Sequence, residues 1–284
     1  MRMKRNGRCS GITYILPGFL GLCAFFILPF IISIRYMFTK GSLALRFVGF
    51  DNFKELLHNP AFLLALKNTC IFMAVSVPAV TLGALFLAIF MEENSNRFVR
   101  LALLAPMAMP VASALLGWNA VFGIDGLIGF IARAFGDTGP DYLQDPYARW
   151  VMIFIFLVKN LGYMTIIFAG AVGGIPKEYH DVYSLDSNST IKYTFRVVVP
   201  IIAPVIFFVV ILCFVNGFQI FREVFGLYGN YPPDSLYMLQ NFMNNNFAKL
   251  NYNRLCTASF LVSMSVAAVI SAYLYLQRKA ERQG

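Results

Sequence analysis

The stretch IIAPVIFFVVILCFVNGFQIF, residues 201–221, carries no charged side chain over 21 consecutive positions. A helix rises about 1.5 Å per residue, so about 20 residues are enough to cross a hydrocarbon core roughly 30 Å thick. Segments as long and as apolar as this one are typical of helices that span a membrane. We therefore predict a transmembrane helix here.

Five further segments have the same apolar character and sufficient length. They cover residues 12–34, 70–91, 98–122, 151–174 and 257–276. The first follows a basic N-terminus, as in a signal peptide, but its apolar stretch is longer than an h-region and no small-residue cleavage site follows it. We expect it to remain as a span. The prediction is an all-α polytopic membrane protein with six transmembrane helices, forming a single domain over residues 1–284.

The composition agrees with this fold class and argues against others. Of the 284 residues, 58% are hydrophobic and 13% are charged, which is about half the charged share of a typical soluble domain. The net charge of +9 comes from basic residues scattered over the termini and loops, a pattern that favours attraction to anionic lipid headgroups over binding of nucleic acid. The five cysteines have no metal-ligand spacing, so we expect neither a metal site nor a disulfide framework.

Six crossings place both termini on the same side of the membrane. Together with the loops near residues 92–100 and 175–200, the termini carry 12 Lys and Arg residues, whereas the other three loops carry 10. The positive-inside rule favours cytoplasmic termini by this small margin, and the dense basic runs at both ends favour the same orientation. We expect the segment 175–200 in the cytoplasm and the loops 35–69, 123–150 and 222–256 outside.

The six predicted spans contain no Asp or Glu, and Lys159 is the one formal charge in the middle of a span. Carriers driven by protons or sodium ions commonly hold carboxylates inside the membrane. The sequence also has no GxxxxGK[ST] phosphate-binding loop and no arrangement typical of a catalytic site. The chain thus has the spans of a transporter without an energy source of its own, and we expect a partner to supply the energy.

The polar segment IPKEYHDVYSLDSNSTIKYTFRVVVP, residues 175–200, separates the fourth and fifth predicted spans. Pro176 suits the first turn of a helix, and Glu178 and Asp181 favour its positive N-terminal end. Turn and N-cap formers follow at 186–189, and a second helix is predicted from Thr190 to about residue 199. We expect a helix-turn-helix element at the membrane surface. An ordinary amphipathic connector would show the same pattern.

The same segment resembles the cytoplasmic EAA motif of permeases of binding-protein-dependent ABC importers, in the form found in the carbohydrate branch. The matching residues are Ile175, Pro176, Glu178, Asp186, Phe195 and Pro200, and Asp181 stands where the motif has Glu. The sequence departs from the motif at four positions, Val182, Tyr183, Ser187 and Asn188. The larger Val-Tyr pair predicts a locally reshaped contact with the partner.

The resemblance to maltose-type, first-subunit permeases extends along most of the chain. Five segments, beginning at residues 66, 105, 142, 158 and 217, follow the pattern: LKNTCIF, APMAMPVASALLGWNAVFGIDGLIGF, YLQDPYARW, VKNLGYMTIIFAGAVGGIP and GFQIFREVFGLYGNYPPDSLYMLQNF. Five segments in the right order are a more specific match than the EAA motif alone.

The resemblance implies a permease subunit of a carbohydrate importer in a bacterial cell membrane. The implied partners are a second, homologous permease, two cytoplasmic ATPases and an extracellular or periplasmic solute-binding protein. Because the ATPases would bind ATP, the chain itself is expected to be no enzyme and to hold no cofactor. The residues that would couple it to an ATPase are Glu178, Asp181, Val182, Asp186, Ser187 and Asn188.

Carbohydrates are bound by hydrogen bonds to amides and by stacking on aromatic rings. Candidates for such contacts lie in the predicted spans: Asn119, Lys159, Asn160, Tyr163, Asn216, Phe218, Gln219 and Phe221. Amides in spans also join helices to one another, and this second interpretation is open for each residue taken singly. As a group, the cluster from Asn216 to Phe221 is the best candidate for lining a substrate path.

Two other functions remain open. A secondary carrier of sugars or small solutes, working without an ATPase, would have the same architecture but lacks the expected carboxylates. A membrane-embedded enzyme has no catalytic arrangement to support it. Within the carbohydrates, the lack of an Arg cluster in the spans is a mild argument against a phosphorylated substrate.

Overall fold

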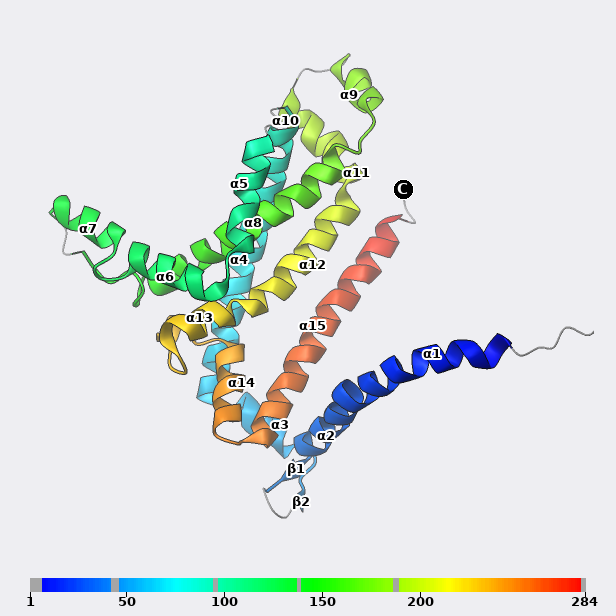
Figure 1. Ribbon diagram of the computed structural model, residues 1–284, viewed down its shortest axis with the longest axis vertical. Helices are drawn as coiled ribbons and strands as arrows, with labels where there is room; N and C mark the ends of the chain where they lie inside the picture. The colour runs from blue at the N-terminus through cyan, green and yellow to red at the C-terminus, as the bar shows by residue number, and fades with distance from the viewer. Residues whose placement is uncertain (1–6, 42–45, 94–96, 137–138, 186–188, 282–284) are drawn as a thin grey trace, which may run out of the picture. The chain divides into compact units, whose positions relative to one another are not determined.

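Helices make up most of the chain (Figure 1). The computed structural model describes residues 7–41, 46–93, 97–136, 139–185 and 189–281. The chain divides into two compact units, of which unit 1 comprises residues 1–62 and 243–268 and unit 2 comprises residues 63–242 and 269–284. The expectation that the whole chain acts as one domain stays a prediction.

Unit 1 begins with a continuous helical stretch made of α1 (Gly7–Leu22), the π-helical turn η1 (Cys23–Ile27) and α2 (Leu28–Met37). The π turn ends two residues before Pro29, whose ring nitrogen cannot donate a helical hydrogen bond. An antiparallel hairpin of β1 (Thr39–Lys40) and β2 (Arg46–Phe47) follows, and then α3 (Asp51–Leu57). The rest of unit 1 comes from the end of α14 (Leu239–Ala248) and the first part of α15 (Tyr252–Glu281).

Polar side chains join these parts of unit 1. Glu55 of α3 accepts hydrogen bonds from Lys40 over 2.7 Å and from the guanidinium of Arg254 in α15. Asn253 donates to the carbonyl oxygen of Tyr36 over 3.0 Å. The segment after the first span therefore contacts the start of α15. The sequence places both contact regions in loops, 35–69 and 222–256, that are predicted to lie on the same side of the membrane.

Unit 2 contains most of the long α4 (Pro60–Glu93), which starts in unit 1. The helices that follow are α5 (Arg97–Ala108), α6 (Val111–Phe122), α7 (Leu127–Ala134) and α8 (Ala148–Val172). The short α9 (Lys177–Ser184), α10 (Thr190–Tyr193), η2 (Thr194–Val198) and α11 (Val199–Ile201) lead to α12 (Ala203–Gln219). Then come α13 (Phe221–Tyr228) and the 3₁₀ turn η3 (Asp234–Leu236).

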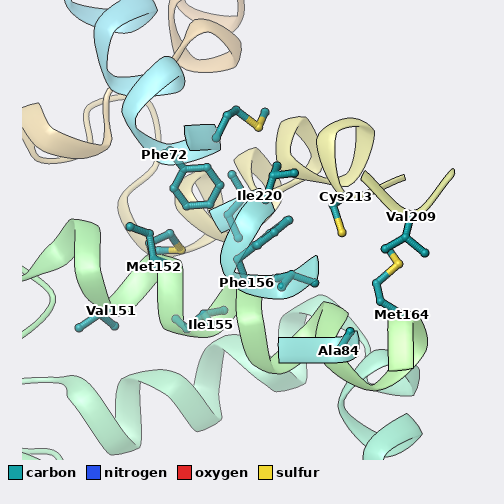
Figure 2. Close-up of a cluster of buried hydrophobic side chains, with 14 of the residues drawn as sticks. Phe72, Ala84, Val151, Met152, Ile155, Phe156, Met164, Val209, Cys213 and Ile220 are labelled. Carbon is teal, nitrogen blue, oxygen red and sulfur yellow. The ribbon is translucent and has the colours of Figure 1, made fainter. Parts of the chain in front are cut away.

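The hydrophobic core of unit 2 is built from α4, α8 and α12. Figure 2 shows Phe72 of α4 beside Phe156 of α8, and their ring centroids lie 5.5 Å apart in an edge-to-face arrangement. Val209 and Cys213 of α12 join the same cluster, and both are fully buried. α8 also packs closely on α5 through Gly162. This packing fixes α8 between the helices that carry the polar residues described below.

Six helical stretches of the described chain are long and apolar enough to cross a membrane, as predicted. They are Tyr14–Met37, Pro60–Met91, Val111–Ala134, Ala148–Val172, Ala203–Tyr228 and Tyr252–Ser271. Five of them overlap the predicted spans over most of their length. The chain is thus a multi-pass membrane protein.

The prediction for the third span, one continuous helix over 98–122, is wrong. The chain forms two helices there, because α5 ends at Ala108 and α6 begins at Val111 after Pro110. Pro110 has extended backbone angles, with φ −58° and ψ 141°. A proline lacks the N–H group that a continuous helix needs and disfavours helical geometry in the residue before it. The candidate span here combines α6 and α7 instead.

Candidate functional site

A lysine and a glutamate form an ion pair between two helices of unit 2. Lys159 lies next to the midpoint of α8 and donates a hydrogen bond from Nζ to Oε1 of Glu223 in α13. The side chain of Glu223 is 2% exposed and that of Lys159 is 24% exposed. Among the buried residues that the structure describes, Glu223 is the only charged one. A lone charge in this position would be costly, so each side chain supplies the countercharge that the other needs.

Amide side chains continue the contact between α8 and α12. Asn216 donates from Nδ2 to Oδ1 of Asn160 over 2.9 Å. Asn160 in turn donates to the carbonyl oxygen of Phe156, one turn earlier in α8, over 2.9 Å. Nε2 of Gln219 lies 3.5 Å from Oδ1 of Asn216. We name this group the polar seam: Lys159, Asn160, Asn216, Gln219 and Glu223.

The spacing of these residues explains the seam. Asn216 and Gln219 are three residues apart in α12, a spacing that keeps side chains on one face of a helix, and Glu223 follows four residues later in α13. Lys159 and Asn160 are neighbours in α8 and each meets one of them. The seam holds one positive and one negative side chain, so its net charge is zero. Its exposed amide, Gln219, can both donate and accept hydrogen bonds.

The other residues predicted to line a path lie around the seam or in the core. Asn119 is exposed on α6. Tyr163 and Phe218 are half-buried and pack against the hydrophobic core. Phe221 is half-buried, with its ring centroid 5.5 Å from that of Phe225. Of the eight candidates, the structure joins Asn160, Asn216 and Gln219 in one hydrogen-bonded group. Lys159, the neighbour of Asn160 in α8, pairs with Glu223 instead.

The sequence interpretation misses Glu223, and the expectation that no span contains a carboxylate is wrong. The predicted fifth span ends at residue 221, whereas the stretch that can cross a membrane continues to Tyr228 and so includes Glu223. Two patterns in the sequence point to this residue. Lys159 needs a countercharge in the membrane, and Glu223 continues the helical repeat of Asn216 and Gln219.

The segment 175–200 forms the predicted pair of helices after α8. Pro176 caps α9, and Glu178 lies in its first turn. The second helix starts at Thr190, where the hydroxyl of Ser189 accepts from the backbone N–H of Lys192, and it continues through α10, η2 and α11. Of the residues predicted to couple to a partner, Glu178, Asp181 and Val182 are exposed. The other three, Asp186, Ser187 and Asn188, lie outside the described residues.

A half-open groove of about 510 Å³ separates the two helices of this segment from the ends of α4 and α8. The rings of His180 and Tyr183, both in α9, contact the ring of Tyr193 at centroid distances of 5.2 and 5.5 Å. These contacts hold the helix pair together. The opposite edge of α9 remains available to another protein, since Val182 is 68% exposed.

A second polar cluster lies at the N-terminal end of α8. Nη2 of Arg149 donates to Oδ1 of Asn68 over 2.8 Å and to the carbonyl oxygen of Ser235 over 3.2 Å. Asn68 donates to the carbonyl oxygen of Tyr237 over 3.0 Å. These contacts fix the segment 229–238 against α4 and α8. Within unit 2, the cluster and the α9–α10 pair therefore lie at opposite ends of α8 (Figure 1).

The sequence is similar to several named transport proteins over nearly its full length, although no family model matches it. It is 25% identical to the lactose transport system permease protein LacF of Rhizobium radiobacter over 98% of this chain and 97% of that protein. It is 26% identical to the probable ABC transporter permease protein YesP of Bacillus subtilis, over 96% and 92% of the two chains. It is 24% identical to the sn-glycerol-3-phosphate transport system permease protein UgpA of Pectobacterium atrosepticum, over 97% of each.

The fold is similar to that of a chain in the crystal structure of a bacterial ABC transporter involved in the import of the acidic polysaccharide alginate. The TM-score is 0.81 with 17% identity, and the match covers 94% of each chain. A second structure, of the bacterial alginate ABC transporter in complex with a periplasmic protein that holds an alginate pentasaccharide, gives the same TM-score over 99% and 98% of the two chains.

Proposed function

We propose that the chain is a permease subunit of an ABC transporter and that it forms half of the translocation path of a carbohydrate importer in a bacterial cell membrane. A second, homologous permease would supply the other half. Two cytoplasmic ATPases would bind and hydrolyse ATP, so the chain itself would catalyse no reaction and hold no cofactor. A solute-binding protein outside the membrane would deliver the carbohydrate.

The carbohydrate class is supported by the relatives and by the chemistry of the polar seam. The named relatives include transport systems for lactose and for sn-glycerol-3-phosphate, and the match to each runs over nearly the whole chain. The similar folds come from an importer of a polysaccharide. The amide of Gln219 suits the hydroxyl-rich rim of a sugar, and the rings of Phe218, just before it, and Phe221, two residues after it, suit the apolar faces.

The observation that carries the coupling role is the exposed acidic edge of α9. Glu178, Asp181 and Val182 are exposed on a short helix that stands beyond the end of α8. The backbone of the segment is braced by the contacts of His180 and Tyr183 with Tyr193. A helix held in this way can transmit a push to α8 and to α12, the helices on either side of it in the chain. We assign to it the contact with one ATPase, together with Asp186, Ser187 and Asn188.

The same argument gives the orientation. If α9 contacts an ATPase, the segment 175–200 and both termini lie in the cytoplasm. The cluster of Arg149, Asn68 and Ser235, at the other end of α8, then lies on the outer side. The segment 229–238, which this cluster holds in place, would face the solute-binding protein.

Charge reversal on α9 tests this function. Asp181→Lys should abolish co-purification of the ATPase subunits with the permease and reduce ATP-driven uptake of carbohydrate, because the exposed carboxylate would become a cation at the contact. Asp51→Lys, at an exposed carboxylate in the first turn of α3, serves as the matched control and should leave the association intact. If Asp181→Lys changes neither association nor uptake, α9 is not the coupling element.

One observation favours a second candidate, an ion-coupled carrier that works without an ATPase. Glu223 is a buried carboxylate in a span, and such carriers commonly use one. Its pairing with Lys159 makes it a poorer ion site, because the carboxylate already has a countercharge. Uptake in vesicles separates the two candidates. An importer needs ATP and resists dissipation of the ion gradients, whereas a carrier stops when the gradients collapse.

A further inference from the structure

The polar seam places a cation in the middle of a span and cancels its charge there. Lys159 lies next to the midpoint of its span, whereas the other basic residues of the described spans lie nearer to an end: Arg35, Lys67, Arg133, Arg149, Arg222 and Arg254. Its side chain remains 24% exposed, so part of the lysine lies at the surface of unit 2. The countercharge, Glu223, is 2% exposed and lies behind it.

An anionic cargo would bind weakly at this position. The carboxylate of Glu223 already accepts a hydrogen bond from Nζ of Lys159, and a second anion beside it would experience like-charge repulsion. An anion could replace Glu223 as the partner of Lys159 only by leaving a buried carboxylate unpaired, which is strongly unfavourable. Arg222 is exposed on α13, but its side chain projects from a different face of the helix than that of its neighbour Glu223.

An uncharged hydroxyl-rich cargo meets no such penalty. A lysine ammonium has three N–H donors, and the carboxylate of Glu223 takes one of them. The remaining donors, and the exposed amide of Gln219, can bind sugar hydroxyls without disturbing the ion pair. The amides of Asn160 and Asn216 bind each other and hold α8 and α12 in place beside them.

We propose that Glu223 is a specificity-determining residue: it cancels the charge of Lys159, and the path lined by the seam carries an uncharged carbohydrate. The inference rests on the proposed function, because it concerns the cargo that passes along the seam. It narrows that function, since carbohydrates that carry carboxylates or phosphates are excluded from the path.

Matched sugars with and without a charge test the proposal. The complete transporter with its solute-binding protein is reconstituted in proteoliposomes that enclose ATP. The probes are radiolabelled neutral oligosaccharides and the aldonic acids made from them by oxidation at the reducing end, such as lactose and lactobionate. We expect ATP-driven uptake of a neutral sugar and none of the acids. Uptake of the acids at comparable rates would overturn the charge assignment but leave an importer. ATP-driven uptake of neither series would overturn the proposed function itself.

Variants separate the role of Glu223 from the selectivity of the binding protein. Glu223→Gln leaves Lys159 without its countercharge, so the acid should bind there and compete with the neutral sugar. The concentration of acid that halves uptake of the neutral sugar should therefore be about tenfold lower for this variant than for the wild type. Lys159→Met combined with Glu223→Gln should remove this gain, and Asp51→Asn, which removes an exposed carboxylate of unit 1, should not produce it. An unchanged sensitivity of Glu223→Gln to the acid would overturn the role of Glu223. Should this variant fail to assemble, uptake of the acids by the wild type would still overturn the exclusion of charged cargo.

Discussion

Gly162 of α8 lies directly against Leu103 of α5: a Cβ atom built on the glycine would stand 1.7 Å from the carbonyl oxygen of the leucine. Helices in membranes approach this closely where one of them lacks a side chain. Because the obstacle is backbone, a side chain at position 162 must push the two helices apart. We predict that Gly162→Val destabilises the protein by about 1–3 kcal/mol or more, measured by thermal unfolding in detergent.

Gly170→Val is the matched control, since Gly170 lies in the same helix and a Cβ built there would meet nothing within 4 Å. A β-branched residue carries the same intrinsic helix penalty at both positions. The loss specific to Gly162 therefore measures the contact with α5. Equal losses for the two variants would contradict the prediction.

The Lys159–Glu223 pair should show strong coupling in stability. Lys159→Met leaves the buried Glu223 without a countercharge, so we predict a loss of about 3–5 kcal/mol in the free energy of unfolding. Glu223→Met should cost a similar amount. The double variant Lys159→Met/Glu223→Met should regain most of the loss, because no lone charge remains in the membrane interior. Thermal unfolding of the four proteins gives the cycle, and additive losses would show that the two side chains do not depend on each other.

The apolar runs predict the number of spans because length and the absence of charge are the properties that a hydrocarbon core demands. They do not predict where a helix breaks within such a run. Residues 98–122 are apolar throughout most of their length, yet Pro110 separates α5 from α6. The ends of spans are equally hard to place, since α13 continues the fifth candidate span to Tyr228.

Because span ends are hard to place, the sequence predicts the residues of the seam that lie inside apolar runs but misses Glu223. Lys159, Asn160, Asn216 and Gln219 are polar residues inside apolar runs, and the structure joins them in one seam. Glu223 lies just beyond the predicted span end and so looks like a loop residue. Its pairing with Lys159 depends on how α8 and α13 are rotated about their axes. Helix rotation follows from packing against neighbours, which a single sequence does not specify.

Arg149 should control the order of the segment 229–238. Its guanidinium bridges Asn68 and the carbonyl oxygen of Ser235, a geometry that needs the planar fork of arginine. We predict that Arg149→Ala speeds proteolysis of the native protein within 229–238 by about tenfold, because local opening becomes easier. Arg149→Lys should give an intermediate rate, since a lysine keeps the charge but not the fork.

The control for this experiment is Arg133→Ala. Arg133 donates a hydrogen bond to the carbonyl oxygen of Ile124, nine residues earlier in the chain, and should not affect cleavage in 229–238. A rate that is unchanged in Arg149→Ala, or equally raised in Arg133→Ala, would show that Arg149 does not anchor the segment.

Glu55 should make the stability of unit 1 depend on pH. Hydrogen bonds from Arg254 and Lys40 lower the pKa of its carboxyl from the ordinary 4.5 to about 2. A lowered pKa in the folded state means that the ionised carboxylate stabilises the fold above the unfolded pKa of 4.5, and that this contribution disappears as the pH falls toward 2. The side chains are partly exposed, so we expect a contribution of about 0.5–1 kcal/mol at neutral pH.

Glu55→Gln removes the titrating group and should lower stability at neutral pH while making it less sensitive to acid. Unfolding followed from about pH 6 to about pH 3 should therefore give curves for the wild type and the variant that converge as the pH falls. Glu178→Gln, at an exposed carboxylate with no ion pair among the described residues, should leave the wild-type curve unchanged. Parallel curves for the wild type and Glu55→Gln would mean that the carboxylate does not titrate differently in the folded and unfolded chains. The contact of α3 with α15 would then have to be held by the hydrogen bonds of Asn253 and by apolar packing alone.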